Sequence, residues 1–247
     1  MNPFDITRAA IGNTFRSKTR TTLTVTAIVI GASGGIGAAL ALRLEAAGQT
    51  VHRLSRSSGE FDYAAPDSIA EAAERLKPHA PFDRIIVATG MLHDGDLSPE
   101  RSLRELDADR LSQTFLVNAI GPALVMRHFL ALLAPDGRFA ALSARVGSIS
   151  DNRAGGWYGY RASKAALNQL VRTAAVELSR SKPEALCVAL HPGTVDTAMS
   201  KPFQRGVAPE KLFSADRSAG HLIAVLDALA PGDSGGLFDW AGKPIPF

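Results

Sequence analysis

Short apolar runs rich in β-branched residues alternate along this chain with longer segments that carry apolar residues at helical spacing. The runs predict strands at 25–30, 50–54, 84–88, 137–143, 185–190 and 236–239, and the longer segments predict helices at 36–47, 68–76, 108–133, 158–180 and 218–229. Strands that alternate with helices are typical of βαβ units. We therefore expect an α/β fold, with a doubly wound parallel sheet and helices on both faces.

The predicted elements belong to a single domain. No linker rich in Pro, Gly or Ser divides residues 25–247, whereas residues 1–24 precede the first strand as an extension of unassigned role. Gly121-Pro122 interrupts the helix predicted at 108–133, and we expect a kink or a close packing contact there. In open parallel sheets, ligands bind beyond the carboxyl ends of the strands, so the functional residues are expected at those ends.

Composition and charge narrow the class of protein. Hydrophobic residues make up 46% of the 247 residues, which is enough for a packed core. The net charge of +3 is concentrated in residues 1–22, where four basic residues accompany one acidic residue, so the folded body lacks the basic face that nucleic-acid binding requires. The single cysteine, Cys187, lies in an apolar run and is expected to be a buried thiol, and no Cys/His spacing indicates a metal site. These features fit a cytoplasmic protein.

An uncharged stretch at residues 21–42 is long enough to cross a membrane and follows a basic segment. It also contains four glycines within seven residues, at positions 31, 34, 35 and 37. This spacing favours a buried strand, a glycine turn and a helix over a membrane span. A membrane-tethered protein that uses the N-terminal arm is the alternative.

The glycine turn between the first strand and the first helix predicts a phosphate-binding loop. Glycines let the backbone approach a pyrophosphate, and the helix N-terminus presents free N–H groups to it. A tight structural turn is the simpler alternative, but the preceding strand and the following helix favour nucleotide binding. The predicted binding residues are Gly31, Ser33, Gly34, Gly35, Ile36 and Gly37.

The end of the second predicted strand indicates which dinucleotide binds. NAD sites usually place an acidic residue there, to bind the ribose hydroxyls. This chain has none between His52 and Ser58, and Arg56 lies between two serines. A guanidinium is suited to a 2′-phosphate, so the sequence favours NADP(H), with a solvated surface arginine as the alternative.

Tyr160 and Lys164 lie four residues apart at the start of a predicted helix, and such residues share a helical face. A nearby ammonium stabilises a phenolate, so we expect Lys164 to lower the pKa of Tyr160 towards the range useful for proton transfer. Taken alone, the pair is as consistent with surface or packing residues.

The order and spacing of Gly31-x-x-x-Gly35-x-Gly37, Asn118 and Tyr160-x-x-x-Lys164 resemble the short-chain dehydrogenase/reductase family over residues 24–247. The segments 146–152, 160–168 and 238–247 resemble its C-factor and sniffer-type carbonyl reductase branch. The resemblance implies a Rossmann-type fold, NADP(H) as cofactor, a small carbonyl or alcohol substrate, and a homodimer or homotetramer.

The resemblance also implies roles for individual residues. Tyr160 would be the general acid/base, Lys164 would bind ribose, and Asn118 would hold a proton-relaying water, its alternative being a helix-kink hydrogen bond. Asp62 and Tyr63 resemble a pair that contacts adenine. The remaining implied cofactor contacts follow the third predicted strand, which is the fourth in family order, and the sixth family strand. They are Ala88, Gly90, Pro192, Gly193, Val195 and Thr197.

Two departures from the family pattern affect the site. Val87-Ala-Thr-Gly90 stands where the family usually has Asn-Asn-Ala-Gly, and Ala144 stands where a catalytic serine is usual. Ser148, twelve residues before Tyr160, is our preferred catalytic serine, and Ser143 is the alternative. A purely structural role for Ser148, in hydrogen bonds within its loop, is the other possibility.

The sequence thus predicts an NADPH-dependent carbonyl reductase with Asn118, Ser148, Tyr160 and Lys164 as its catalytic residues. The apolar segment 198–215, broken by Pro and Gly, is expected to cover the substrate. A nucleotide-binding signalling or regulatory protein of the same fold is the alternative function.

Overall fold

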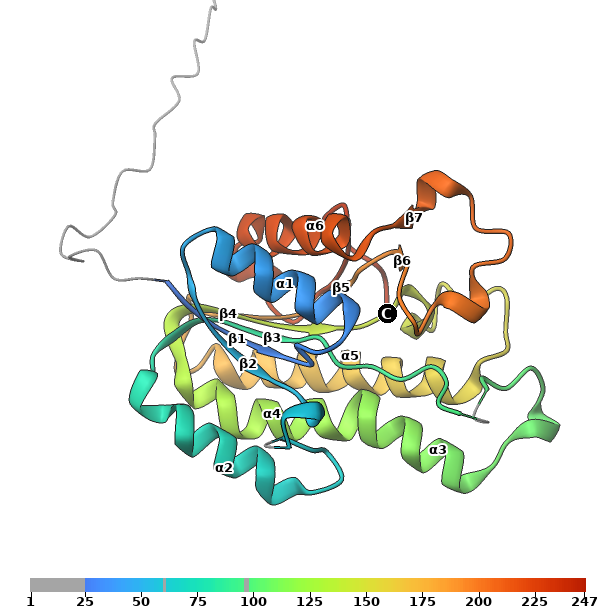
Figure 1. Ribbon diagram of the computed structural model, residues 1–247, viewed down its shortest axis with the longest axis horizontal. Coiled ribbons are helices and arrows are strands. Elements are labelled where there is room, and N and C mark those ends of the chain that lie inside the picture. The colour runs from blue at the N-terminus through green and yellow to red at the C-terminus, as the bar shows by residue number, and fades with distance from the viewer. Residues whose placement is uncertain (1–24, 60, 96–97) are drawn as a thin grey trace, which may run out of the picture.

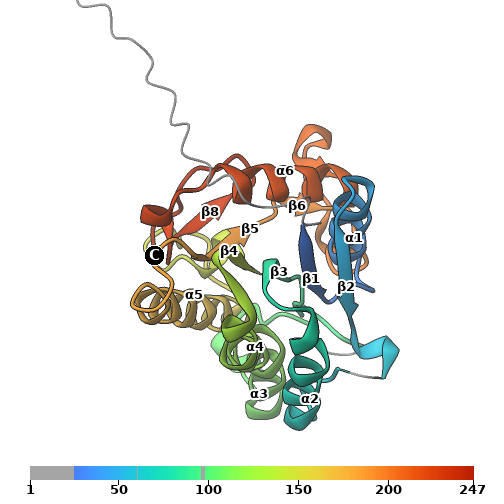
Figure 2. The same ribbon diagram turned by 90° about the vertical axis from the view of Figure 1, so that its left-hand side faces the viewer.

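The computed structural model describes residues 25–59, 61–95 and 98–247. Its main sheet has six parallel strands in the order β2-β1-β3-β4-β5-β8 (Figures 1 and 2). These are β1 (Thr26–Ile30), β2 (Thr50–Leu54), β3 (Phe82–Val87), β4 (Leu133–Leu142), β5 (Leu186–His191) and β8 (Leu237–Asp239). The chain passes from β1 to β2 on one side and to β3 on the other, so the switch point where such sheets bind ligands lies between β1 and β3.

Helices cover both faces of this sheet, as the sequence predicts. Helices α1 (Gly35–Ala46) and α6 (Ala215–Ala228) pack against each other on one face. Figures 1 and 2 show the remaining helices on the other face, namely α2 (Pro66–Leu76), α3 (Ala108–Phe115), α4 (Gly121–Phe129) and α5 (Tyr158–Leu178). The predicted doubly wound α/β architecture is therefore confirmed.

The central strands are apolar along their whole length because both of their faces are buried. In β1, Ala27 and Val29 point to the core shared with α1 and α6. Ile28 and Ile30 point to the opposite core, which contains residues of α2, α4 and α5. Successive side chains alternate between the two faces of a strand, so one continuous apolar run supplies both cores.

The helix predicted at 108–133 runs through α3, a π-helical turn at Leu116–Ile120, and α4. The π-turn immediately precedes Gly121-Pro122, where the sequence predicts a kink or a close contact. A Cβ atom on Gly121 would lie 2.4 Å from the ring of Tyr63, so the glycine allows this ring to pack against the helix. Close packing is therefore part of the reason for the glycine, and the π-turn accommodates the proline.

Of the described helices, the one spanning Ala108–Leu132 is long and apolar enough to cross a membrane by length and composition alone. It packs against α5 and α2, as a core helix does. In the uncharged stretch at 21–42, residues 26–30 form β1 and residues 35–42 lie in α1, so the predicted strand, turn and helix are confirmed there. The arm at 1–24 lies outside the described residues.

The segment that follows β5 returns to the same end of the sheet. Strand β6 (Thr194–Val195) pairs with β7 (Leu212–Phe213), and 3₁₀ turns at Lys201–Phe203 and Pro209–Lys211 lie between them. In Figure 1 this segment projects from the main body near the N-terminal end of α1. The segment expected to cover a substrate therefore lies at the carboxyl edge of the sheet.

Candidate active site

The glycine loop after β1 forms the predicted cradle at the start of α1. Gly31 has a φ of +86°, a left-handed conformation that favours glycine. A Cβ atom on Gly37 would lie 2.2 Å from the carbonyl oxygen of Gly31, so only glycine fits there. The N-cap residue of α1, Gly34, has no side chain to bond the first turn, and that turn has no acidic residue. The N–H groups of this turn therefore suit a pyrophosphate.

The loop also fixes the position of Arg56. The N–H groups of Gly31 and Ala32 donate to the carbonyl oxygen of Leu54 at 2.8 and 3.1 Å, which joins the glycine loop to the end of β2. Arg56 begins the 3₁₀ turn Arg56–Ser58 two residues later, and its side chain is exposed. Arg56 is thus placed beside the predicted phosphate loop with its guanidinium open to a ligand. These residues fit an NADP(H) dinucleotide.

Tyr63 is buried, and its contacts are with residues of the core and of the segment after β3. Its ring packs against Gly121, and its hydroxyl lies 2.9 Å from the Thr89 hydroxyl. Burial raises the pKa of the Tyr63 phenol. The half-buried Asp62 accepts a hydrogen bond from the N–H of Ala64. The ring of Tyr63 therefore has a packing role, and the adenine contact of Asp62 and Tyr63 stays a prediction.

Gly90, three residues after the end of β3, lies next to two of the predicted catalytic residues. A Cβ atom there would lie 3.6 Å from the Lys164 Nζ atom and 3.7 Å from the Asn118 Oδ1 atom. It would also lie 3.5 Å from the terminal methyl of Met199, which belongs to the segment after β6. The backbone at Gly90 therefore borders a point where three separated parts of the chain meet.

Asn118 lies in the π-turn and is fully buried. Its Oδ1 atom accepts from the Met91 N–H at 2.8 Å, and its amide donates to the Met91 carbonyl at 2.8 Å and to the Ser163 hydroxyl at 3.1 Å. These bonds use both amide hydrogens of the side chain, and the water-holding role of Asn118 stays a prediction. Its backbone carbonyl is the better acceptor for a water, since Pro122, four residues later, has no N–H to offer it.

Tyr160 and Lys164 lie on one face of the first turns of α5, as predicted. The Lys164 Nζ atom lies 5.9 Å from the centre of the Tyr160 ring and donates to the Leu142 carbonyl at 2.8 Å. Lys164 is 2% exposed, while Tyr160 is partly exposed. The helix thus brings the phenol and the amine together at the carboxyl end of β4.

The expected lowering of the Tyr160 pKa is wrong, because burial raises it. Burial raises the pKa of Tyr160 to about 12 and lowers the pKa of Lys164 to about 7. Desolvation outweighs the mutual attraction because the ammonium is directed at the Leu142 carbonyl and does not contact the phenol oxygen. Near neutral pH the tyrosine is protonated, and Lys164 is divided between its charged and neutral forms.

The two predicted serines are both buried and have different partners. The Ser143 hydroxyl donates to the Asn168 Oδ1 atom at 2.6 Å, which ties the end of β4 to α5. The Ser148 oxygen accepts from the Asp151 N–H at 3.1 Å, as a loop-forming serine does, while its own proton has no acceptor among the described residues. Ser148 therefore retains a donor for a ligand, whereas Ser143 does not. The choice of Ser148 stays a prediction.

The residues after β5 divide between packing and the cleft. Gly193 has a φ of +80°, and a Cβ atom there would lie 2.7 Å from the Phe213 ring. Val195 is buried in the β6–β7 pair. The Thr197 side chain would lie 2.8 Å from a Cβ atom on Gly35, so it borders the glycine loop. Of the residues predicted for this segment, Thr197 is thus the best placed near a phosphate.

Three aromatic groups in successive contact form a wall that begins beside Tyr160, and the sequence indicates this wall only in part. The Trp157 ring lies edge-on to Tyr160, with 6.2 Å between the ring centres, and 5.3 Å from the Phe203 ring. His93 lies 5.7 Å from Phe203 and bonds the Met199 carbonyl through its Nε2 atom. Phe203 belongs to the segment expected to cover the substrate, but no sequence signal identifies His93.

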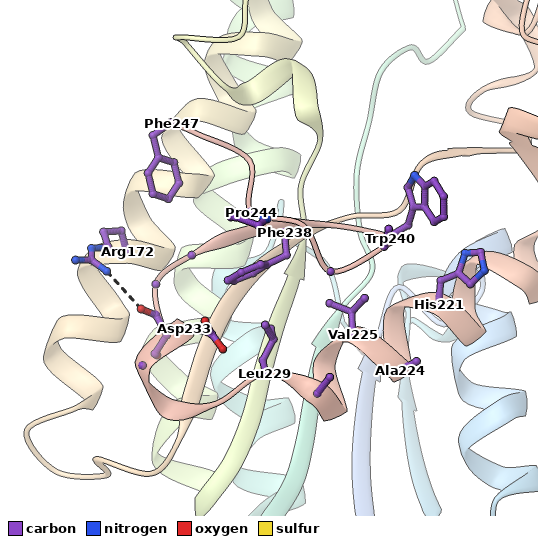
Figure 3. A pocket seen from close by; sticks show the side chains of 17 residues that line it. Arg172, His221, Ala224, Val225, Leu229, Asp233, Phe238, Trp240, Pro244 and Phe247 are labelled. Carbon is purple, nitrogen blue, oxygen red and sulfur yellow. Dashed lines mark hydrogen bonds between the residues drawn. The ribbon is translucent and has the colours of Figure 1, made fainter. Parts of the chain in front are cut away.

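A cavity of about 750 Å³ lies elsewhere, between α6, β8 and the C-terminal tail. Figure 3 shows Trp240, Phe238, Leu229 and Phe247 around it, with Arg172 at its edge. None of the predicted catalytic or cofactor residues lines this cavity. The chemistry is therefore assigned to the carboxyl ends of the strands, where the titratable pair and the glycine loop are found.

Comparisons with known proteins are consistent with this site. A family model described as short chain dehydrogenase matches residues 25–208. C-signal from Myxococcus xanthus is 37% identical over 149 residues, which make up 59% of this chain and 84% of that protein. NADPH-bound carbonyl reductase from chicken fatty liver has a TM-score of 0.75 at 25% identity, with 91% of this chain and 100% of that chain covered. Carbonyl reductase Sniffer of D. melanogaster shares the fold, with a TM-score of 0.76, 20% identity and the same coverage.

Proposed function

The chain belongs to the short-chain dehydrogenase family of oxidoreductases, and on that premise we propose that it is an NADPH-dependent reductase of a small carbonyl substrate. The observation that carries this proposal is the Tyr160–Lys164 pair on α5, with the Lys164 amine next to Gly90 and Asn118. This arrangement combines a proton donor and a cation with the exposed N–H groups of the glycine loop at the switch point of the sheet. The reverse reaction would oxidise an alcohol.

The choice of NADPH rests on Arg56. An exposed guanidinium follows β2, and no acidic residue lies between Ser55 and Ser58 to bind ribose hydroxyls. The Ser55 and Ser57 hydroxyls lie 3.0 Å apart beside it and offer further donors to a phosphate. The chicken relative was solved with bound NADPH, which agrees with this choice.

In the proposed reaction each side chain handles protons in a definite way. Tyr160 donates its proton to the substrate carbonyl oxygen as the carbonyl carbon gains a hydride, which the reduced nicotinamide supplies when it is bound. The high pKa of Tyr160 keeps this proton in place until it is needed. The phenolate that remains is costly in a buried position, so a protonated Lys164 would stabilise it and a proton from solvent would restore it. Ser148 would donate to the same substrate oxygen.

A nucleotide-binding signalling role is the second candidate, since the C-signal protein is a relative. Retention of Asn118, Tyr160 and Lys164 in one cluster argues against the loss of catalysis, because a binding protein does not need a proton donor at this position. The two functions differ in turnover. The signalling role would be favoured if the purified chain binds NADPH but none of a broad panel of carbonyl compounds makes it oxidise the bound NADPH.

Melting curves with NADPH and with NADH test the cofactor directly. A ligand that binds only the folded state raises the melting temperature in proportion to RT ln(1 + [L]/Kd). We expect a clearly larger rise with NADPH than with NADH at equal concentration. An equal rise in melting temperature with both cofactors would contradict the preference for NADPH. No rise with either cofactor would contradict the proposed reductase activity.

A further inference from the structure

The backbone immediately before α5 is held in a conformation that needs support. Trp157, the N-cap residue of α5, has a φ of +54° and is the one non-glycine residue with a positive φ in the described part of the chain. Gly155 and Gly156 before it are also left-handed. A bulky residue in the left-handed region is strained and persists only where its surroundings impose that conformation. Neighbouring groups must therefore hold this turn.

Glu100 holds the N–H side of the turn. Its carboxylate accepts from the Gly159 N–H at 3.1 Å, and its backbone carbonyl accepts from the Trp157 N–H at 2.5 Å. The residue is 6% exposed, which is unusual for a glutamate. A carboxylate in the first turn of a helix also interacts favourably with the helix dipole. Glu100 therefore contacts the turn through both its side chain and its backbone.

Arg161 holds the carbonyl side of the same turn. Its guanidinium donates to the Gly156 carbonyl at 2.9 Å, to the Gly155 carbonyl at 3.1 Å and to the Val146 carbonyl at 3.4 Å. The turn thus lies between a carboxylate that accepts a hydrogen bond from a backbone N–H group and a guanidinium that donates hydrogen bonds to backbone carbonyls. We call Glu100 and Arg161 the turn clamp.

The turn clamp has a consequence for the active site, because the clamped residue is Trp157. The Trp157 ring lies between Tyr160 and Phe203, with interplanar angles of 78° and 67°. If the turn relaxed to an ordinary backbone conformation, the Trp157 side chain would project from the backbone in a different direction. The contact between the Trp157 ring and the Tyr160 ring would then be lost.

We propose that Glu100 is a positioning residue for carbonyl reduction, which it supports by holding Trp157 against Tyr160 through the left-handed turn. This inference rests on the proposed function for its catalytic consequence, but the placement of Trp157 can be measured without turnover. Glu100 does not need to touch substrate or cofactor in this role. If Glu100 had only a structural role, its substitution would lower stability without moving the Trp157 side chain. It would also not lower kcat while leaving the affinity for NADPH unchanged.

The test compares E100A with E100Q and with the matched control E105A. Glu105 lies in the same loop region and also accepts a backbone N–H, that of Arg101 at 2.9 Å, but this bond is exposed. All variants carry W240F, because Trp240 is the other of the two tryptophans, so fluorescence and near-UV circular dichroism report Trp157 alone. Carbonyl reduction and the Kd of NADPH are measured in the same set.

We expect E100A to shift the Trp157 emission and weaken its near-UV signal, and to lower kcat by about tenfold, since a misplaced active-site wall carries penalties of this size. The Kd of NADPH should change by less than about twofold. E100Q should remain close to the parent, because an amide oxygen still accepts from the Gly159 N–H. E105A should be unchanged in every measurement.

An unchanged Trp157 spectrum in E100A overturns the proposal, and so does an E100Q variant as impaired as E100A. If E100A fails to fold, G159A gives the answer, since its Cβ atom would lie 2.9 Å from the Glu100 Oε1 atom and displace the carboxylate. An unperturbed Trp157 in folded G159A would also overturn the proposal. If the parent protein reduces no carbonyl, the proposed function is contradicted but the turn clamp is not, because the spectra still show whether Glu100 holds Trp157.

Discussion

The Lys164 amine donates a hydrogen bond of 2.8 Å to the backbone carbonyl of Leu142, the last residue of β4. This bond fixes the start of α5 against the carboxyl end of the sheet and holds Lys164 at a defined position. An ammonium has three donors, so the bond to Leu142 leaves two for a ribose hydroxyl or a water. The amine therefore serves as an anchor and still has donors for a ligand.

The pH dependence of reduction should follow Lys164. Burial lowers the pKa of Lys164 to about 7, and a lysine is charged below its pKa, so the ammonium is present at low pH and lost as the pH rises through 7. Burial raises the pKa of Tyr160 to about 12, so the proton donor stays protonated throughout this range. Initial rates of reduction at saturating NADPH should therefore fall by about tenfold between pH 6 and pH 8.

The K164R variant is the control for this profile. A guanidinium stays charged at these pH values, so the descending limb should disappear in K164R even if its overall rate is lower. A flat profile in the parent protein, or the same descending limb in K164R, would show that another group controls the rate.

Substitution of the two buried serines should have opposite effects. S143A removes the donor to the buried Asn168 Oδ1 atom, and an unsatisfied buried acceptor costs about 1–3 kcal/mol, so S143A should lose stability and keep most of its turnover. S148A removes the predicted donor to the substrate oxygen and should lower kcat by about 10²-fold with a smaller loss of stability. Urea unfolding and steady-state kinetics separate the two effects. The reverse outcome would assign the catalytic role to Ser143.

Removal of the Arg56 guanidinium should alter cofactor preference without altering the chemistry. In R56A we expect the Kd of NADPH to rise by about tenfold or more, because a charge-assisted, paired contact to the 2′-phosphate is lost. The Kd of NADH should stay nearly constant, because NADH has no 2′-phosphate. Titrations followed by cofactor fluorescence measure both values. R53A is the matched control, since Arg53 is paired with Glu45 at 2.6 Å, and an equal loss of NADPH affinity in R53A would contradict the assignment.

The sequence predicts most of the fold because each signal is local and repeated. The apolar strands bury both faces, and the glycines at 31–37 lie between a strand and a helix, which separates this stretch from a membrane span. The start of α6 is predicted less accurately. The helix begins at Ala215, and Ser214 caps it by accepting a hydrogen bond from the Arg217 N–H. The serine precedes the apolar periodicity that the helix prediction uses, so the prediction begins three residues late.

The site is predicted less completely because its finer features depend on contacts between distant residues. Spacing on one helix is enough to pair Tyr160 with Lys164, but burial sets their pKa values, and burial depends on the whole fold. The Asn118 amide is occupied by Met91, 27 residues earlier, which no local pattern indicates. Glu100 is unremarkable in sequence, since its partners Trp157 and Gly159 lie more than fifty residues later.

Proton delivery by Tyr160 is the central claim, and the Y160F variant tests it most directly. The Kd of NADPH and the rate of NADPH oxidation in the presence of a reducible carbonyl should be measured for the parent protein and for Y160F. We predict similar affinity in both proteins and a rate lower by about 10²–10⁴-fold in Y160F, because a phenyl ring has no proton to give. A Y160F variant that oxidises NADPH at the parental rate would contradict the account.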